Sequence, residues 1–152
     1  MLGNLTQEEM EQLLQRNSIG RIGCNDGEAT YVVPISYVYE DGILICHSRD
    51  GMKISMMRRN PDVCFLVDEI RDYNHWRSVI CWGRYEEITE DEEIAYAQQF
   101  FSNLMLDQKT VPSALPPHTQ QERHHHHRPA YTPTIFYRIR INKATGRFEH
   151  GT

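Results

Sequence analysis

Residues 30–83 contain the pattern that most restricts the fold: two pairs of strand-like runs separated by one short basic helix. In the first run, apolar and aromatic side chains recur at every second position and so share one strand face. These positions are Tyr31, Val33, Ile35, Tyr37 and Tyr39. The dipeptide Asp41-Gly42 predicts a hairpin into the second run, residues 43–48. Since strands joined by tight hairpins pair antiparallel, this region predicts an antiparallel sheet.

Pro34 lies inside the first run. Because proline has no N–H to donate, we expect an edge, a bulge or a gap in the hydrogen-bond ladder there. The sequence predicts a helix over residues 51–59 that ends before Asn60-Pro61. Further strands are expected at 63–68 and 76–88, with a polar loop at 71–75 between them.

Two capping boxes predict helices outside this region. Thr6-Gln-Glu-Glu9 predicts a helix over residues 7–16, and Thr89-Glu-Asp-Glu92 predicts a second one that continues past Phe101. Strands are expected at 19–24 and 134–141, and a turn at 144–147. The Pro- and His-rich stretch at about 107–133 predicts a long irregular loop.

These elements predict a mainly β (β+α) fold. Hairpins dominate and helices are few, so the economical architecture is a six-stranded antiparallel split β-barrel with a few peripheral helices, because closure removes exposed strand edges. The 152 residues fit one domain covering residues 1–152.

Charge and cysteine content limit the possible partners and compartment. The formal net charge is -5, which provides no positive field for nucleic acid or an anionic membrane, and we expect neither as a partner. The four cysteines are widely separated, without metal-binding or disulfide-framework spacing. No secretory signal or membrane-length apolar run is evident, so we expect a cytoplasmic protein.

Several short motifs in this order resemble the FMN-binding split-barrel superfamily of pyridoxamine 5'-phosphate oxidase-like proteins, and particularly its 5-nitroimidazole-resistance (Nim-like) branch. The motifs are Tyr31-Val-Val-Pro34, Cys46-His-Ser48, Gly51-Met-Lys53, Asn60-Pro61 and Arg77-Ser-Val79 followed by Gly83. The resemblance implies FMN, or occasionally FAD, bound at the interface of a homodimer. It also implies a small-molecule substrate.

The resemblance assigns cofactor-binding roles to two groups of residues. It places one strand along the flavin ring, through Val32, Val33, Pro34, Ile35 and Ser36. It places further contacts near the ring, the ribityl chain and the phosphate, and these are His47, Ser48, Lys53, Ser78 and Val79.

Lys53 is the expected phosphate ligand. A helix N-terminus and a cation together suit a phosphate, and Gly51-Met-Lys53 opening the helix offers both. Many relatives carry arginine just before the lysine, whereas this chain has Met52, so a bidentate phosphate clamp is lost. Arg58 and Arg59 fit either the phosphate site or a solvated helix face.

Two readings of His47 stay open. Its imidazole, with an ordinary pKa near ~6.5, could act catalytically by protonating a reduced substrate, or it could merely hydrogen-bond the cofactor. Ser78 has no histidine–carboxylate pair placed with it, so cofactor contact is favoured over nucleophilic catalysis. The four adjacent histidines at 124–127 lack the spacing of a specific metal site, and a solvated loop is favoured there.

The leading hypothesis is an FMN-dependent oxidoreductase that reduces a small electrophile, such as a nitroaromatic, with electrons from reduced nicotinamide. A flavin supplies the electron chemistry, so no catalytic triad is required from the protein. The alternatives are a non-catalytic flavin-binding protein and a haem-handling split-barrel protein.

Overall fold

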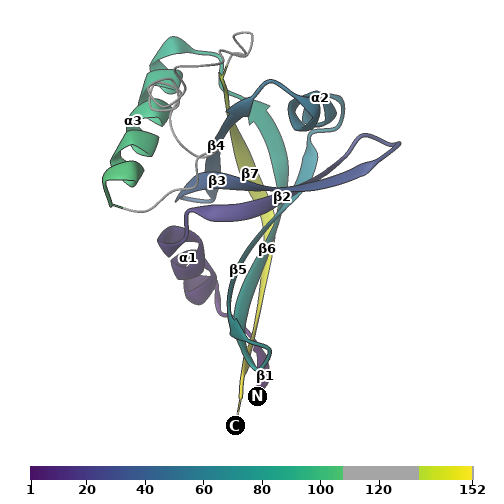
Figure 1. Cartoon of the computed structure of the whole chain (residues 1–152), viewed down its shortest axis with the longest axis vertical. Helices are drawn as coiled ribbons and strands as arrows, with labels where there is room; N and C mark the ends of the chain where they lie inside the picture. The colour runs from purple at the N-terminus through teal and green to yellow at the C-terminus, as the bar shows by residue number, and fades with distance from the viewer. Residues whose placement is uncertain (108–133, 152) are drawn as a thin grey trace, which may run out of the picture.

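The structure is a computed structural model that describes residues 1–107 and 134–151. Figure 1 shows a curled sheet with helices at its ends and on its outer side. The elements in chain order are β1 (Leu2–Asn4), α1 (Gln7–Arg16), β2 (Ile19–Asn25), β3 (Thr30–Glu40), β4 (Ile43–Arg49), α2 (Met52–Arg59), β5 (Asp62–Asp72), β6 (His75–Glu87), α3 (Asp91–Asp107) and β7 (Thr134–His150).

Antiparallel pairing closes the sheet into a barrel. The strand order is β1-β7-β4-β3-β2-β5-β6, and β6 also pairs with β7, so six strands form a ring. The predicted fold class is therefore confirmed. The seventh strand, β1, has only three residues and pairs with the end of β7, which is why sequence periodicity did not indicate it.

The barrel opens between β3 and β4. These strands pair only from Tyr37 opposite Cys46 to the hairpin at Glu40 and Ile43. Before Tyr37, β3 pairs with β2 alone, while beyond Cys46, β4 pairs with β7 alone. Pro34 thus lies where β3 has an open edge, as its missing N–H predicts.

Helix α1 forms at the predicted capping box. The Glu9 amide donates to Thr6 Oγ1 at 3.2 Å, and the Thr6 amide donates to Glu9 Oε2 at 2.7 Å. The helix buries Leu13 and Leu14 in the main core, and the Tyr37 hydroxyl donates to the Leu14 carbonyl at 2.7 Å. Figure 1 shows α1 beside β5 and below β3.

The other two helices cover different surfaces. The buried side chains of α2 (Ile54, Met56 and Met57) belong to the main core inside the barrel. Helix α3 packs Phe101 against Ile45 and Phe136 in a second cluster, on the outer face of β4 and β7. The sheet is therefore apolar on both faces where α3 covers it.

One predicted break in a strand is wrong, and another is shorter than predicted. The expected turn at 144–147 lies inside β7, which continues to His150 with a bulge near Asn142. Gly146 is explained by packing, since a Cβ there would lie 2.7 Å from Met10 Cγ. Likewise, the expected loop at 71–75 is mostly strand, because β5 runs to Asp72 and β6 starts at His75. Both breaks were predicted from local composition, which long-range pairing overrode.

The predicted loop at 107–133 and the histidines at 124–127 lie outside the described residues, apart from Asp107 at the end of α3. Within the described part of the chain, no helix is both long and apolar enough to cross a membrane.

Candidate functional site

The five β3 residues expected along the cofactor divide between two faces. Val33 and Ile35 point inward and pack with the main core. Val32 and Pro34 are exposed on the outer face, Val32 with 62% of its surface accessible. Ser36 shares that outer face but is buried. Of these five residues, only Val32, Pro34 and Ser36 therefore direct their side chains to the outside of the barrel; Val33 and Ile35 have backbone groups at the open edge.

His47 and Ser48 follow the last β3–β4 pair and point to opposite faces of β4. The His47 ring is buried under α3, with its centroid 4.5 Å from that of Phe101 and 5.7 Å from that of Phe136. Ser48 belongs to the inward face, which it shares with Cys46. These two neighbours therefore cannot both turn their side chains to the same side of the strand.

Three buried hydroxyls have no hydrogen-bond partner among the described residues: Ser36 Oγ, Ser48 Oγ and Tyr137 Oη. Buried polar groups are normally satisfied, so each of these hydroxyls calls for a water or a ligand as partner. Two of them, Ser36 and Ser48, flank the opening between β3 and β4. Tyr137 was not indicated by the sequence, because nothing local distinguishes it from other core aromatics.

Helix α2 supplies a half-buried cation beside this opening. Burial lowers the pKa of Lys53, and its amine has no ion pair or hydrogen bond with any residue in the described ranges. By contrast, Arg58 contacts Glu87 at 2.8 Å, and Arg59 contacts Asp26 at 3.3 Å. The helix begins after Gly51, which makes no side-chain cap, and its first turn has no acidic residue. Lys53 is thus the α2 cation that remains available for an anion.

Ser78 and Val79 lie on β6, far from this opening in the ring order. Three strand steps separate β6 from β3 in either direction around the six-stranded ring. Val79 is fully buried in the core, whereas Ser78 lies on the outer face and is half-buried. Within one chain, the structure does not bring Ser78 to the β3 residues.

The outer face of the sheet carries a largely apolar surface that links these strands and is interrupted by Arg21. Across β3, β2, β5 and β6, one row of directly paired residues comprises Val32, Gly23, Cys64 and Trp82. The next row comprises Pro34, Arg21, Leu66 and Ile80. Trp82 is 40% and Ile80 37% exposed, and Lys143 Nζ lies 5.4 Å from the Trp82 ring centroid. We define these two rows as the outer apolar face.

Strand alternation could have indicated part of this outer apolar face. Ile80 and Trp82 alternate with the buried Val79 and Cys81, so the two faces of β6 are both apolar. A second apolar face on a strand needs a cover. The pattern itself does not say whether a helix, a loop or another subunit provides it.

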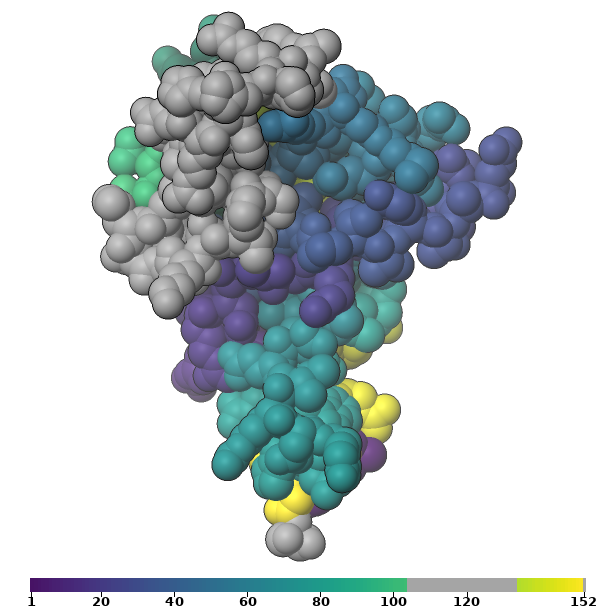
Figure 2. Space-filling model, viewed as in Figure 1, coloured from purple at the N-terminus to yellow at the C-terminus, as the bar shows by residue number. Residues whose placement is uncertain are grey.

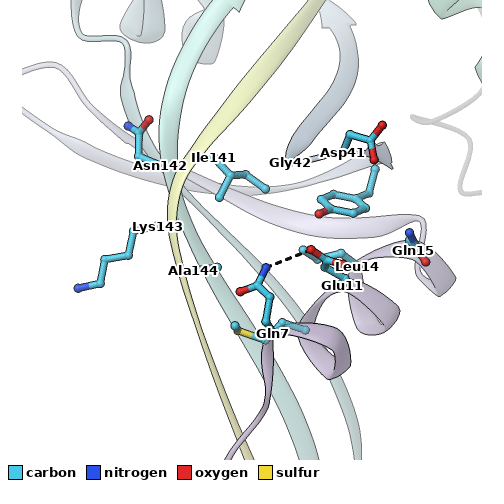
Figure 3. A pocket seen from close by; sticks show the side chains of 12 residues that line it. Gln7, Glu11, Leu14, Gln15, Asp41, Gly42, Ile141, Asn142, Lys143 and Ala144 are labelled. Carbon is cyan, nitrogen blue, oxygen red and sulfur yellow. Dashed lines mark hydrogen bonds between the residues drawn. The ribbon is translucent and has the colours of Figure 1, made fainter.

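Two surface hollows lie away from the β3–β4 opening. Figure 3 shows one of about 420 Å³, bordered by α1, the Asp41-Gly42 turn and the bulged part of β7. Its only drawn hydrogen bond joins Gln7 to Glu11, at 3.1 Å, and Lys143 points away from α1. The other hollow, about 490 Å³, lies between α3 and strands β3, β4 and β7. Neither contains a residue expected to bind the cofactor.

The surface around the opening is irregular. Figure 2 shows the tip of the β2–β3 hairpin projecting at the right beside α2, and the ends of β5, β6 and β7 forming a narrow lower tip. Within the described residues, no group of three or more His, Cys, Asp or Glu side chains could hold a metal ion.

A small antiparallel barrel split between β3 and β4, with helices outside it, defines the class of split β-barrels. Residues 6–148 match the family model described as pyridoxamine 5'-phosphate oxidase, and the chain belongs to this family.

Solved structures and a curated relative agree with this family. An FAD-binding protein from Mesorhizobium loti is 30% identical, with 99% of this chain and 98% of that chain covered and a TM-score of 0.74. A protein from Bacteroides thetaiotaomicron, provisionally described as a 5-nitroimidazole antibiotic resistance protein, shares the fold at 21% identity, 97% and 87% coverage and a TM-score of 0.71. An uncharacterised protein of Rhizobium meliloti is 27% identical over 94% of this chain and 92% of its own length.

Proposed function

We propose that this protein is a flavin-dependent oxidoreductase that reduces a small electrophile, such as a nitroaromatic, with electrons from reduced nicotinamide. The observation that carries the proposal is the open β3 edge beside Lys53, a half-buried cation at the start of α2 that has no ion pair among the described residues. Apolar side chains suit a flavin ring, and the cation suits a phosphate. Family membership and the FAD-binding relative support the same ligand class.

The residues present fit a flavin. Val32 and Pro34 offer an apolar wall, and the unpaired backbone of β3 offers donors and acceptors to a ring edge. Lys53 and the α2 N-terminus would hold the phosphate, while Ser36 and Ser48 have hydroxyls without partners to contribute. A bound flavin supplies hydride and electron transfer, so the protein's task is to bind, orient and exclude water.

Either FMN or FAD fits these observations. Met52 is 60% exposed at the position where many relatives place arginine, so a single lysine is left for the phosphate end. The relative at 30% identity is an FAD-binding protein, which favours testing FAD beside FMN.

A homodimer would complete the site, with one flavin-binding domain over residues 1–152 in each subunit. Ser78 lies across the ring from β3, so it can approach the same flavin as Val32 only from a second copy. The outer apolar face extends from Val32 to Trp82 and offers the surface for that contact. We expect such a dimer to operate in the cytoplasm, and the four cysteines form no disulfide that would favour an oxidising compartment.

His47 is best assigned to positioning. Its ring is enclosed by Phe101 and Phe136, so its burial favours support of the adjacent strand over proton transfer to substrate. The same burial argues against His47 as a haem ligand. A measurement of turnover distinguishes the enzyme from the alternative, a flavin-binding protein without catalytic activity.

The test is spectroscopic and then kinetic. The purified protein should show flavin absorbance, or should quench the fluorescence of added FMN or FAD to a saturable endpoint. With reduced nicotinamide, it should reduce a nitroimidazole or quinone faster than the same concentration of free flavin. Absence of flavin binding would reject the proposal, and binding without turnover would favour a flavin-binding protein that is not an enzyme.

A further inference from the structure

Tyr137 is a buried phenol whose hydroxyl has no hydrogen-bond partner in the described part of the chain. Its residue is completely buried in the main core, on β7. Leaving a buried hydroxyl unpaired costs stability, whereas phenylalanine would fill the same space without that cost. The hydroxyl therefore needs an explanation beyond packing.

The nearest polar group that could explain it is Ser48. Tyr137 pairs with Cys46, and Ser48 is the next residue on the same inward face of β4. Burial raises the pKa of Tyr137 well above its usual value, and the Ser48 hydroxyl acts weakly in the opposite direction. The strand register thus makes the two side chains diagonal neighbours, although neither oxygen has a partner within hydrogen-bond distance among the described residues.

The phosphate end of the proposed ligand lies at the same end of the barrel. Ser48 leads within three residues to Gly51, where α2 begins. Lys53 lies in the first turn of that helix. Ser48 and Lys53 therefore lie shortly before and shortly after the point where α2 begins.

We propose that Tyr137 is a positioning residue for a phosphorylated ligand and acts through Ser48. A phosphate has only acceptor oxygens, so Ser48 must donate its proton to it, which leaves the Ser48 lone pairs free to accept the Tyr137 proton. A chain of two hydrogen bonds then runs from Tyr137 through Ser48 to the phosphate, and each bond polarises the other. This inference rests on the proposed flavin function.

The matched control is Tyr85, a neighbouring phenol whose ring centroid lies 5.1 Å from that of Tyr137. Its hydroxyl already donates to Glu87 Oε1 at 2.8 Å. Tyr85→Phe removes a hydroxyl with a partner, and Tyr137→Phe removes one without. The two variants should therefore differ in both stability and ligand selectivity.

The experiment measures the Kd values of FMN and riboflavin, together with the ligand-free melting temperature, for wild type and both variants. Tyr137→Phe should raise the Kd of FMN about three- to tenfold, the worth of one hydrogen bond, while leaving riboflavin binding unchanged. Its ligand-free melting temperature should not fall. Tyr85→Phe should lower the melting temperature and leave the ratio of the two Kd values unchanged.

A double-mutant cycle tests the chain itself. Ser48→Ala should also weaken FMN binding, and Tyr137→Phe should add little further loss in that background. Equal weakening for FMN and riboflavin, additive losses, or a lower ligand-free melting temperature in Tyr137→Phe would each overturn the inference while the flavin function stood. A wild-type protein that binds neither flavin would reject the proposed function and this inference together.

Discussion

At the residue scale, three side chains expected to share one role have separate environments. Lys53 is a half-buried cation without an ion pair among the described residues, whereas His47 is enclosed by aromatic rings. Val79 is fully buried in the core. Of these, Lys53 is the side chain best suited to select an anionic ligand, because a partly desolvated charge gains most from a charged partner.

We expect Lys53→Met to weaken FMN binding while leaving riboflavin binding nearly unchanged. A hydrogen bond to a charged group is worth about 1.5–3 kcal/mol, so the Kd of FMN should rise by about 10- to 100-fold. Because burial lowers the pKa of Lys53, the wild-type FMN affinity should start to fall as pH rises toward that lowered value, through loss of the positive charge. Titration by fluorescence quenching across alkaline pH measures both effects.

Arg58→Met is the control for Lys53→Met. Arg58 lies on the same helix as Lys53, but it already forms an ion pair with Glu87 of β6. It should leave the ratio of the FMN and riboflavin Kd values unchanged. An equal loss of FMN affinity in the two variants would mean that the helix charge as a whole, and not the Lys53 amine, attracts the phosphate.

At the element scale, helix α1 is attached to the sheet by a surface contact as well as by its apolar side. Arg16 donates to both carboxylate oxygens of Glu69 on β5, at 2.6 and 2.5 Å, and Asn17 donates to the same carboxylate at 2.9 Å. The Arg16 contact is the main reason that the pKa of Glu69 is lowered. Both charged side chains are more than a third exposed, so the stabilisation is small.

Glu69→Gln should lower the free energy of unfolding by about 0.5–1 kcal/mol at neutral pH. A carboxyl with a lowered folded-state pKa stabilises above its unfolded pKa, and the contribution is lost as pH falls through the folded value. The difference between variant and wild type should therefore vanish in the acid range below the ordinary glutamate pKa. Urea denaturation at neutral and acid pH tests this, and a difference independent of pH would show that packing is responsible.

Gly83 marks the closure of the barrel, where the β6–β7 register shifts between Trp82 and Gly83. A Cβ on Gly83 would lie 2.3 Å from the Arg140 carbonyl oxygen, which is backbone and cannot move aside cheaply. We expect Gly83→Ala to destabilise the protein by about 1–3 kcal/mol, the range of overpacked core sites. Chemical denaturation of the purified variant measures the loss.

Gly27→Ala provides the comparison for Gly83→Ala. Gly27 has a positive φ of 95° but no atom within 4 Å of an added Cβ. Gly27→Ala should therefore lower the free energy of unfolding only through backbone strain, by about 1–2 kcal/mol. If Gly83→Ala were the milder of the two, close approach to β7 would not be the reason for glycine at this position.

At the scale of the whole molecule, the outer apolar face sets the expected assembly. It runs across four strands and leaves Val32 and Trp82 substantially exposed in a single chain. A second copy on this face would bury these side chains and would bring another Ser78 toward the β3 edge. Assembly and cofactor binding should therefore be coupled.

Trp82→Glu should shift the protein from dimer to monomer and weaken flavin binding at the same time, because it places a charge in an apolar interface. Light scattering after size-exclusion chromatography, with and without FMN, measures the assembly. Tyr96→Ser, which removes an exposed aromatic from α3, should leave both properties unchanged. A monomeric wild type that binds flavin normally would contradict the coupling.

The sequence alone determined the elements whose signals are local. Three of these elements are the capping box at Thr6 and Glu9, the hairpin at Asp41-Gly42 and the proline at the open edge. Each depends on residues that are at most a few positions apart, so the sequence alone predicts it. The order of the strand motifs also predicted the barrel and its family. The extension of β5 to Asp72 and the continuation of β7 through Gly146 were missed, because pairing with other strands stabilises them.

Only the tertiary structure decided which side of each strand faces the core and which residues meet. It turned His47 and Ser48 to opposite faces, separated Ser78 from the β3 edge, and brought Tyr137 beside Ser48 from a strand that begins 86 positions later in the chain than Ser48. These contacts depend on barrel closure between β6 and β7 and on the gap between β3 and β4. Such non-local pairing depends on many packing contacts and hydrogen bonds between distant residues, and these cannot be predicted from any short stretch of sequence.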